Sequence, residues 1–267
     1  MKRFVFFVIF SFVFSLIFIF VPIRGTFPFP QGQHYIAHAC GNINGYSCTN
    51  SKEAFESSLK KGIRFIEVDL NLTTDGVLVC THDWETFRNQ TMPRIKGLES
   101  SAAMDYGSFK SNKIFKELTP LSIYDIYVFF SKYPDFYLVT DKISDPEVID
   151  KWFGNYKDRV IIECFSFYDY MALREKHYIL PMLSDTPNLL VLIKQRIYAL
   201  LKFRSFSNSI FYVFPISHYR NHKMYHDLLS KFLRYSFALF TVETRAEADS
   251  IFLSNRNVRL LYVNDID

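Results

Sequence analysis

Apolar and polar positions along the chain follow two periods that alternate. Beyond residue 30, short apolar runs typical of buried strands are followed by amphipathic stretches with helical spacing. The strand-like runs cover residues 34–38, 64–70, 136–141, 159–165, 178–183, 209–216, 237–242 and 258–263. The helix-like stretches cover residues 51–61, 122–132, 146–153, 168–176, 188–203, 223–235 and 245–253. Eight strands that alternate with helices predict a parallel α/β architecture.

Three stretches need separate interpretation. Residues 77–82 form an additional strand-like run after the turn signal Asp75-Gly76, so we expect a hairpin with the preceding strand. Residues 85–118 are polar and show no clear period, which predicts a long loop covering the site. The apolar helix at 189–201 is interrupted by charged residues, so it is either a barrel helix or a membrane-facing one, and not a second span.

The first 24 residues predict a membrane anchor. Lys2 and Arg3 precede an uncharged run from Phe4 to Ile23, and about 20 apolar residues span the hydrocarbon core of a bilayer. This run is longer than that of a typical cleaved signal peptide, and no clear small-x-small cleavage site follows it. We therefore expect residues 1–24 to remain as a transmembrane signal anchor, with one domain, residues 25–267, on the extracytoplasmic side.

Composition narrows the classes of fold and partner. A length of 267 residues holds one barrel of roughly 200–250 residues and leaves no room for a second domain. The net charge of +4 without a long basic run argues against nucleic acid as a partner and is compatible with a mild attraction to anionic lipid. Cys40 and Cys48 bracket a short loop that a disulfide could brace outside the cytoplasm. No Cys-x-x-Cys pattern occurs in the sequence, so a zinc site is not expected.

Two carboxylates and two histidines lie at the ends of the early strand-like runs. Glu67 and Asp69 are two residues apart on one predicted strand, so both side chains project from the same face. Carboxylates this close repel each other unless a cation lies between them, and Ca²⁺ or Mg²⁺ suits oxygen ligands. His38 ends the first run and His82 ends the hairpin strand. Because histidines beside a metal can serve as base and acid, the sequence predicts a metal-assisted acid–base site.

Four histidines in the second half of the chain are not expected to belong to the site. His177, His218, His222 and His226 lie in or beside helix-like stretches with Lys and Arg nearby. They are expected to be ordinary surface histidines or histidines with hydrogen-bond partners. His218 is the exception, because it follows a strand-like run and could reach the rim of the site.

A series of short motifs resembles a known enzyme family. The first block contains Ala37-His38, Asn50-Ser51-x-Glu53-Ala54-Phe55, Gly62, Ile66-Glu67-Val68-Asp69, Thr73-x-Asp75-Gly76, Val79 and His82-Asp83. Later blocks are Thr119-Pro120-Leu121, Val160-Ile161-Ile162 with Ser166-Phe167, Thr241-Val242-Glu243 and Tyr262-Val263-Asn264-Asp265. Together these resemble the glycerophosphodiester phosphodiesterase family, one of the phospholipase C-like phosphodiesterases. The first block is specific, and the later blocks gain weight from their order.

The resemblance implies a fold and a chemistry. The fold is a (β/α)₈ TIM barrel, here preceded by the N-terminal transmembrane helix. The activity is that of a phosphoric diester hydrolase with a divalent metal ion, Ca²⁺ or Mg²⁺, on Glu67 and Asp69, and with His38 and His82 as the acid–base pair. In such enzymes a substrate hydroxyl attacks the phosphodiester, often giving a cyclic phosphate that water then opens. The expected substrate is a glycerophosphodiester, a phospholipid headgroup or an envelope phosphodiester.

Three positions depart from the pattern that the family usually shows. Ala39 stands where an Arg usually follows the first His, and Thr49 replaces an acidic residue before the Asn-Thr position. Loss of both charges reads as the deletion of one ion pair. The third metal ligand is usually a Glu two residues before a Lys, whereas Asp141 and Lys142 are adjacent. We expect Asp141 to be the third ligand and Lys142 to contact the phosphate, which requires the strand to twist or end at Asp141.

Two alternatives to a hydrolase remain open. The first is a phospholipase D-like lyase that forms a cyclic phosphate, because such barrels also dispense with the arginine after the first histidine. The second is a non-catalytic barrel that keeps the metal ligands and serves in envelope or surface-polymer biosynthesis. Retention of both His38 and His82 favours an enzyme.

Overall fold

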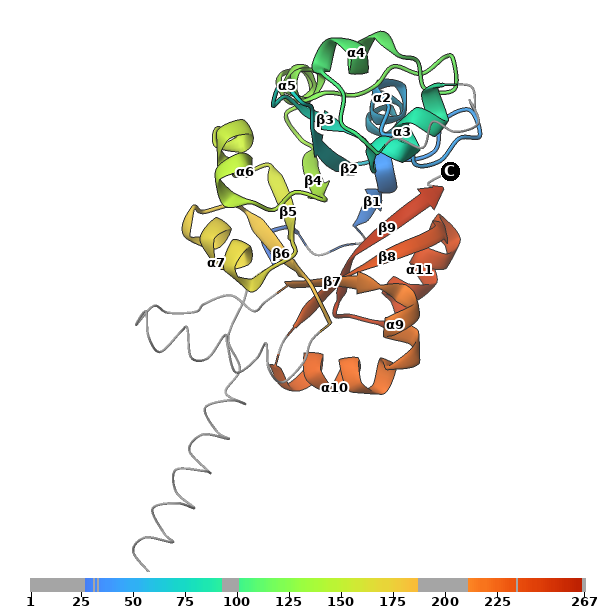
Figure 1. The fold of residues 1–267 in the computed structure, drawn as a ribbon. Helices are drawn as coiled ribbons and strands as arrows, with labels where there is room; N and C mark the ends of the chain where they lie inside the picture. Colours follow the sequence, from blue (N-terminus) through green and yellow to red (C-terminus); the bar gives the residue numbers. More distant parts are fainter. Residues whose placement is uncertain are drawn as a thin grey trace, which may run out of the picture.

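The computed structural model describes residues 27–30, 32, 34–92, 101–186, 211–233 and 235–265. Its strands are β1 (Tyr35–Ala37), β2 (Phe65–Leu72), β3 (Leu78–Cys80), β4 (Tyr137–Asp141), β5 (Val160–Cys164), β6 (Leu180–Ser184), β7 (Phe211–Pro215), β8 (Ser236–Thr244) and β9 (Val258–Asp265). Its helices are η1 (His38–Cys40), α2 (Lys52–Lys60), α3 (Trp84–Thr91), α4 (Tyr106–Ser111), α5 (Ile123–Lys132), α6 (Pro146–Phe153), α7 (Phe167–Glu175), α9 (Ile216–Asn221), α10 (Lys223–Leu233) and α11 (Arg245–Ser254). Figure 1 shows α6, α7, α9 and α11 on the outside of the strands, and α3 and α4 together beside β3.

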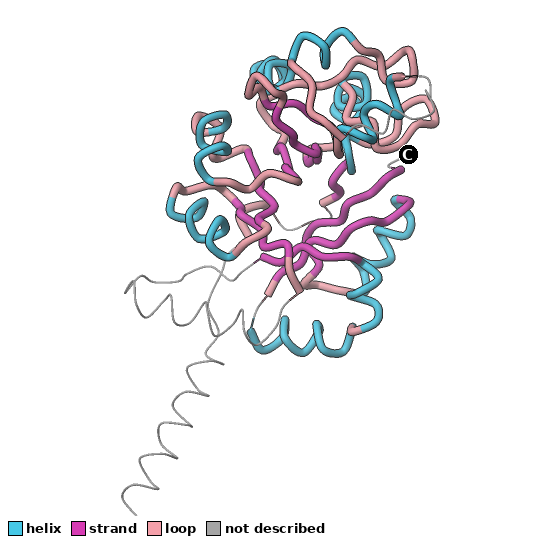
Figure 2. Tube along the Cα trace, viewed as in Figure 1, coloured by secondary structure: helices cyan, strands magenta, loops and turns pink. Residues whose placement is uncertain are grey.

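Eight of the strands close into a parallel barrel. Each of β2, β4, β5, β6, β7, β8 and β9 pairs in parallel with the next in that order, and β1 pairs in parallel with both β2 and β9 to complete the ring. The ninth strand, β3, pairs antiparallel with β2 as the predicted hairpin. Figure 2 shows the strands in magenta with the helices around them. The predicted eight-stranded α/β barrel is therefore confirmed.

The alternation of side chains along each strand decides what faces the barrel interior. On β2, Phe65 belongs to the cluster of buried residues inside the barrel, while Ile66 and Val68 belong to the larger cluster between strands and helices. Because successive side chains of a strand point to opposite faces, Glu67 and Asp69 share the inward face with Phe65. Apolar residues therefore fill the amino-terminal part of the barrel, and acids follow them on the same face.

Local capping fixes where several helices begin. The Ser51 hydroxyl accepts a hydrogen bond from the Ala54 amide at the start of α2. Asp83 accepts one from the Thr86 amide at the start of α3, at 2.6 Å. Such caps satisfy amides that have no partner within the first turn. The cap at Asp83 also holds the chain immediately after His82 in one orientation.

The prediction of a loop over residues 85–118 was wrong. The described part of this stretch contains α3 and α4, together with a small hydrophobic cluster of its own. The buried members of that cluster are Val79, Trp84, Phe87, Phe109, Ile114 and Leu118. These residues are spaced too irregularly to give a clear period, so the pattern did not reveal two short helices. Residues 93–100 lie outside the described part.

Two further predictions fall on residues that the structure does not describe. These are the transmembrane anchor at 1–24 and the helix at 188–203. Within the described ranges, none of the helices has the length and apolar character needed to cross a bilayer.

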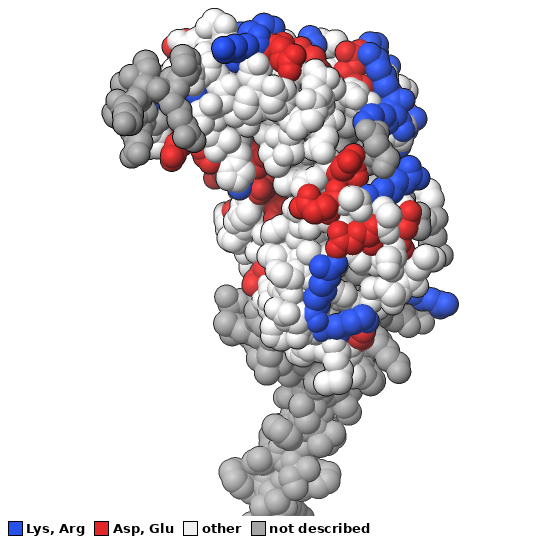
Figure 3. Space-filling model, turned by 90° about the vertical axis from the view of Figure 1, so that its right-hand side faces the viewer, with Lys and Arg blue, Asp and Glu red and all other residues white. Residues whose placement is uncertain are grey.

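Charged side chains of both signs share the surface. On the face that lies at the right of Figure 1, Lys and Arg side chains are interspersed with Asp and Glu side chains (Figure 3). Exposed pairs elsewhere on the surface, such as Arg64 with Asp135 at 2.7 Å, have the same mixed character. This mixture is what a net charge of only +4 leads one to expect.

Candidate active site

A cavity of about 270 Å³ lies at the carboxyl ends of the barrel strands. Its lining includes all six residues that the sequence predicted for the site: His38, Glu67, Asp69, His82, Asp141 and Lys142. Glu163, Phe165, Ser184, Phe240 and Tyr262 complete the lining. Functional groups of (β/α)₈ barrels gather at this end because the loops that follow the strands meet there.

Strand register brings three carboxylates together. Asp69 of β2 is directly opposite Asp141 of β4, and Glu67 precedes Asp69 by two residues on the inward face. Ligand oxygens of Glu67, Asp69 and Asp141 all lie within 4.8 Å of one another. Glu67 and Asp69 are only 1% and 3% exposed. Buried carboxylates at this spacing cannot all be ionised without a compensating positive charge.

The hydrogen bonds of the triad leave room for a cation. Glu67 Oε2 accepts a hydrogen bond from the Ala39 amide at 2.6 Å, whereas Glu67 Oε1 has no partner in the described part of the chain. Burial raises the pKa of Glu67 well above its usual range, and the charges of Asp69 and Asp141 add to the rise. An unpartnered buried oxygen among three acids fits a hard divalent ion that prefers oxygen ligands.

Asn50 holds Asp69 in place from the loop after η1. Its side-chain amide donates to Asp69 Oδ2 at 2.8 Å, and its carbonyl oxygen accepts from the Asp69 amide at 3.0 Å. Burial raises the pKa of Asp69, and the Asn50 hydrogen bond partly opposes that rise. Asn50 therefore fixes one carboxylate oxygen and leaves the other, Oδ1, directed to the cavity side where Lys142 lies.

The strand ends at Asp141, which is the condition under which both Asp141 and Lys142 were expected to face the cavity. β4 ends at Asp141, and Lys142 has a φ of +71°, so the chain leaves the strand between the two side chains. Both can then turn toward the cavity. Lys142 Nζ lies 3.4 Å from Asp141 Oδ2 and 3.9 Å from Asp69 Oδ1. The lysine thus places a positive charge at the edge of the triad.

His38 is the more enclosed of the two histidines, and its ring is held by an amide. Its Nδ1 lies 2.7 Å from Asn264 Oδ1, and the Asn264 amide nitrogen donates to Glu243 at 3.0 Å. Because Glu243 fixes the orientation of the Asn264 amide, Nδ1 of His38 carries the proton and Nε2 keeps a lone pair. Burial acts to lower the pKa of His38, but hydrogen bonds to Cys48 and Asn264 and the charge of Asp69 raise it overall.

His82 has a charged partner and greater exposure. Its Nδ1 lies 2.6 Å from Asp83 Oδ2, and its side chain is 51% exposed. Asp83 itself is held by its cap bond to Thr86. The carboxylate on Nδ1 fixes the orientation of the ring, while the opposite nitrogen stays available. The two histidines of one cavity therefore have different partners and different surroundings.

Comparison with known proteins gives a consistent family and fold. A model of the glycerophosphoryl diester phosphodiesterase family matches residues 41–234. The chain belongs to that family. A comparison with curated protein sequences gives no significant match. This family member is therefore a phosphoric diester hydrolase. The match also confirms the resemblance that was drawn from the motifs.

Solved structures share the fold of this family member at low sequence identity. A phosphodiesterase of Oleispira antarctica in complex with the product sn-glycerol-3-phosphate has a TM-score of 0.59 at 16% identity, covering 86% of this chain and 92% of that one. A glycerophosphodiester phosphodiesterase of Thermotoga maritima has a TM-score of 0.57 at 17% identity, covering 89% and 96%. One from Parabacteroides distasonis has a TM-score of 0.58 at 16% identity, covering 86% and 92%.

Two departures from the family pattern sit directly beside the triad. Ala39 is fully buried with a φ of +44°, and its amide supplies the hydrogen bond to Glu67. Thr49 is buried, and its hydroxyl lies 2.9 Å from the Ser51 hydroxyl. Neither position leaves an unpaired charge. This agrees with the deletion of an ion pair as a unit.

Glu163, Tyr262 and Asn264 are among the residues of the site that were not predicted. Glu163 ends the inward face of β5, is 5% exposed and lines the cavity. Burial and the charge of Asp141 raise the pKa of Glu163 to about 8, and the Tyr262 hydroxyl donates to it at 3.2 Å. Asn264 of β9 orients His38. An acid at the end of the apolar run 160–162 was a visible signal for Glu163, because it is two residues beyond the inward Ile161.

The four cysteines are free thiols in this structure. Cys40 is buried and Cys48 is partly exposed beside His38, so the loop between them is not closed by a disulfide. Cys80 and Cys164 are buried in β3 and β5, as expected for thiols in apolar strands.

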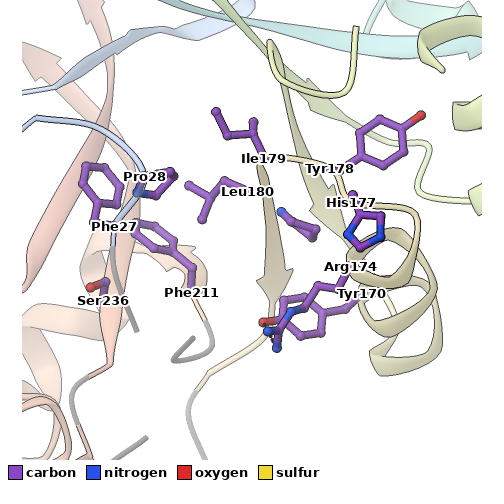
Figure 4. Close-up of a pocket in the computed structure, with 11 residues that line it drawn as sticks. Phe27, Pro28, Tyr170, Arg174, His177, Tyr178, Ile179, Leu180, Phe211 and Ser236 are labelled. Carbon is purple, nitrogen blue, oxygen red and sulfur yellow. Dashed lines mark hydrogen bonds between the residues drawn. The ribbon is translucent and has the colours of Figure 1, made fainter. Parts of the chain in front are cut away.

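A second cavity, of about 340 Å³, lies at the amino ends of β6, β7 and β8, away from the triad. Figure 4 shows Phe27, Phe211 and Ser236 on one side of Leu180, and Tyr170, Arg174 and His177 on the other. None of the described residues that line it is an Asp or Glu, and the amino-terminal face of such barrels commonly serves stability. The triad cavity is therefore the candidate active site, although it is the smaller of the two.

Proposed function

We propose that this family member hydrolyses a phosphodiester bond in a glycerophosphodiester, a phospholipid headgroup or an envelope phosphodiester. Glu67, Asp69 and Asp141 hold one divalent metal ion, Ca²⁺ or Mg²⁺, and His38 and His82 divide the proton transfers. The observation that carries this proposal is the convergence of the six residues on one cavity, with one histidine held by an amide and the other by a carboxylate. The product bound to the Oleispira antarctica phosphodiesterase supports a glycerol phosphate as one half of the substrate.

The first step is an internal attack by a substrate hydroxyl. His38 Nε2 accepts the proton of the hydroxyl that neighbours the phosphate, and the hydroxyl oxygen forms a bond to phosphorus. The bond from phosphorus to the leaving alcohol breaks, and His82 gives a proton to that alcohol. The products are a free alcohol and a cyclic phosphate. This division follows from the lone pair on His38 Nε2 and from the Asp83 carboxylate, which orients His82 and leaves its opposite ring nitrogen available.

Water opens the ring in the second step. His82, now neutral, takes a proton from water, and the resulting oxygen attacks phosphorus while His38 returns its proton to the departing ring oxygen. Lys142 neutralises charge on the phosphate oxygens from the edge of the triad. A metal ion on the triad, when bound, supplies Lewis-acid stabilisation of phosphate charge.

The proposal includes a location. A signal anchor at residues 1–24 would hold the barrel at the extracytoplasmic face of a membrane, next to lipid and envelope substrates. Its support is the uncharged run from Phe4 to Ile23 after Lys2 and Arg3. Reporter enzymes fused after Asp267 test this orientation. A reporter that works only in the cytoplasm contradicts the anchor, and a mature amino terminus near Gly25 contradicts its retention.

One experiment tests activity, metal need and substrate class together. The purified full chain is incubated with glycerophosphocholine, glycerophosphoethanolamine and lysophospholipids in Ca²⁺, Mg²⁺ or EDTA, and products are identified by phosphorus NMR. We expect turnover of at least one diester to a phosphomonoester, and loss of turnover in EDTA. The matched control is His177→Ala, since His177 is exposed and lies outside the triad cavity.

The same spectra separate the hydrolase from its rival. Accumulation of a cyclic phosphate without a monoester indicates a lyase, because the second step then does not occur. No turnover of any diester in either metal contradicts the proposed function.

A further inference from the structure

Three histidines outside the active site lie on successive helical turns. His218 belongs to α9, His222 follows α9, and His226 belongs to α10. The His222 amide donates to the His218 carbonyl at 3.1 Å, and the His226 amide donates to the His222 carbonyl at 3.1 Å. These bonds continue the helical spacing of four residues through the junction of the two helices. The three side chains therefore share one face.

The rings are close enough to share one ion. Ring centroids lie 4.5 Å apart for His218 and His222, 5.2 Å for His218 and His226, and 6.5 Å for His222 and His226. Imidazole nitrogens that bind one tetrahedral metal at about 2 Å keep ring centres about 5 Å apart. Among the described residues, only the acidic triad already has its ligand atoms within 4.8 Å of one another. Convergence of the imidazoles thus needs rotation of the exposed His222 and the half-buried His218.

His226 supplies an observation of a different kind. It is fully buried, and neither of its ring nitrogens has a hydrogen-bond partner in the described chain. Its ring is stacked on Phe214, with centroids 4.9 Å apart, and on Tyr219, at 5.7 Å. Stacking fixes the ring plane but satisfies neither nitrogen, and buried polar atoms without partners are rare in native proteins. A ligand that accepts a lone pair would satisfy one of them.

The electrostatic setting keeps these lone pairs available. Burial, together with His218 and His222, lowers the pKa of His226 to about 4, so its ring is neutral at physiological pH. Burial and His222 also lower the pKa of His218. Metal binding requires neutral imidazole, so protons compete little with the ion at neutral pH.

The nearest basic side chains are engaged elsewhere. Lys223 pairs with Asp227 at 2.6 Å, and Arg220 pairs with Glu247. Their positive charges are therefore largely neutralised and oppose a cation on the histidine face only weakly.

We propose that His218, His222 and His226 form a second metal site, which takes a transition-metal dication such as Zn²⁺. Imidazole ligands select zinc-type ions, whereas the carboxylates of the active site select Ca²⁺ or Mg²⁺, so the two sites differ in chemistry. The bound ion joins α9 to α10 and so braces the connection from β7 to β8. His218 does not line the triad cavity, so this site stands apart from the reacting atoms.

Zinc titration of the full chain tests the site. Calorimetry is performed with Ca²⁺ in excess, so that the acidic triad is occupied. We expect one zinc equivalent per chain, and at least a tenfold rise in its Kd in both His218→Ala and His222→Ala. The matched control His177→Ala removes an exposed histidine far from the cluster and should keep the wild-type Kd. His222 and His177 are exposed and His218 is half-buried, so none of these substitutions empties the core and folding should be preserved.

Cobalt gives an independent readout. Co²⁺ bound by three imidazoles should produce intense visible absorption, which His222→Ala should abolish and an oxygen-only site would not give. An unchanged zinc Kd in His218→Ala and His222→Ala overturns the proposal. So does an equal loss in His177→Ala, because the binding would then reflect scattered surface histidines.

Discussion

The two ends of one barrel differ in what fills them. At the carboxyl ends, Glu67, Asp69 and Glu163 are buried acids whose pKa values are raised by burial and by the charge of Asp141. At the amino ends, aromatic rings pack tightly, with Phe29 only 5.0 Å from Phe65 and 4.6 Å from Tyr137 between centroids.

Strand β2 contributes to both ends. Phe65 belongs to the aromatic packing, and Glu67 and Asp69 follow it on the same inward face. Apolar packing on the same strand thus offsets the free-energy cost of keeping the acids out of water. Changes at one end should alter chemistry with the fold intact, and changes at the other should do the reverse.

The largest effect is expected from the histidines. His38→Ala and His82→Ala should each lower kcat by roughly 10²- to 10⁴-fold, because each removes one proton transfer. Steady-state kinetics on the diester found in the substrate screen measures this loss. Melting temperatures should stay near that of the wild type. An active His82→Ala enzyme would refute the shared role.

The opposite end supplies the converse variant. Phe65→Ala removes a ring that is 5% exposed within the aromatic packing, and should lower the free energy of unfolding by about 3–5 kcal/mol. Denaturant unfolding measures this, with Leu253→Ala as control because Leu253 is 82% exposed. Below its melting temperature, Phe65→Ala should keep a wild-type kcat. A large loss of kcat in the folded variant would show that the two ends are not separable.

Adjacent residues sharpen the comparison within the site. Ca²⁺ or Mg²⁺ should raise the melting temperature of the wild type, since it neutralises the triad, and Asp141→Asn should reduce that rise by weakening the metal site. Lys142→Met should keep the rise and lower kcat about tenfold, because its charge meets the phosphate. Identical melts of the wild type in metal and in EDTA argue against the metal site. Equal metal responses in Asp141→Asn and the wild type remove Asp141 from it.

The last prediction concerns the pH dependence that Glu163 gives to the stability of the metal-free protein. Its folded pKa of about 8 lies above the ordinary value of 4.5, so the folded state holds a proton that the unfolded state releases. Stability from this group is fully present below pH 4.5 and is lost as the pH rises through 8. Between pH 5 and 7 the loss amounts to about 2 kcal/mol. Glu163→Gln should flatten this decline in denaturant unfolding, and a decline of unchanged steepness would contradict the assignment.

Much of the barrel, and the shared face of Glu67 and Asp69, could be predicted from the hydrophobic periodicity of the sequence. Apart from η1, α3, α4 and α9, the strands and helices in the described chain agree with the predicted alternation, because parallel barrel strands are buried on both faces and stand out as apolar runs. The common orientation of Glu67 and Asp69 could also be predicted, since a two-residue spacing on a strand places both side chains on one face whatever the rest of the fold.

Features that depend on long-range contacts or on irregular backbone could not be predicted from the sequence. The role of Asn264 depends on β9 lying beside β1, which no local pattern contains. The turn of Lys142 toward the cavity depends on a left-handed backbone that its sequence does not announce. His226 was expected to have a hydrogen-bond partner or to lie at the surface. It is instead buried without a partner among the described residues, because Phe214 and Tyr219 stack around it.

The bond between His38 and Asn264 joins residues separated by 226 positions in the chain. His38, the proposed base, has its Nδ1 held by Asn264 only when β9 pairs with β1 and closes the barrel. Contacts of such long sequence separation form late, because the loop entropy must be overcome first. Recovery of turnover during refolding should therefore mark the final sealing event. If the proposed base is His38, a partly folded chain whose β9 has not yet paired with β1 should therefore lack hydrolase activity.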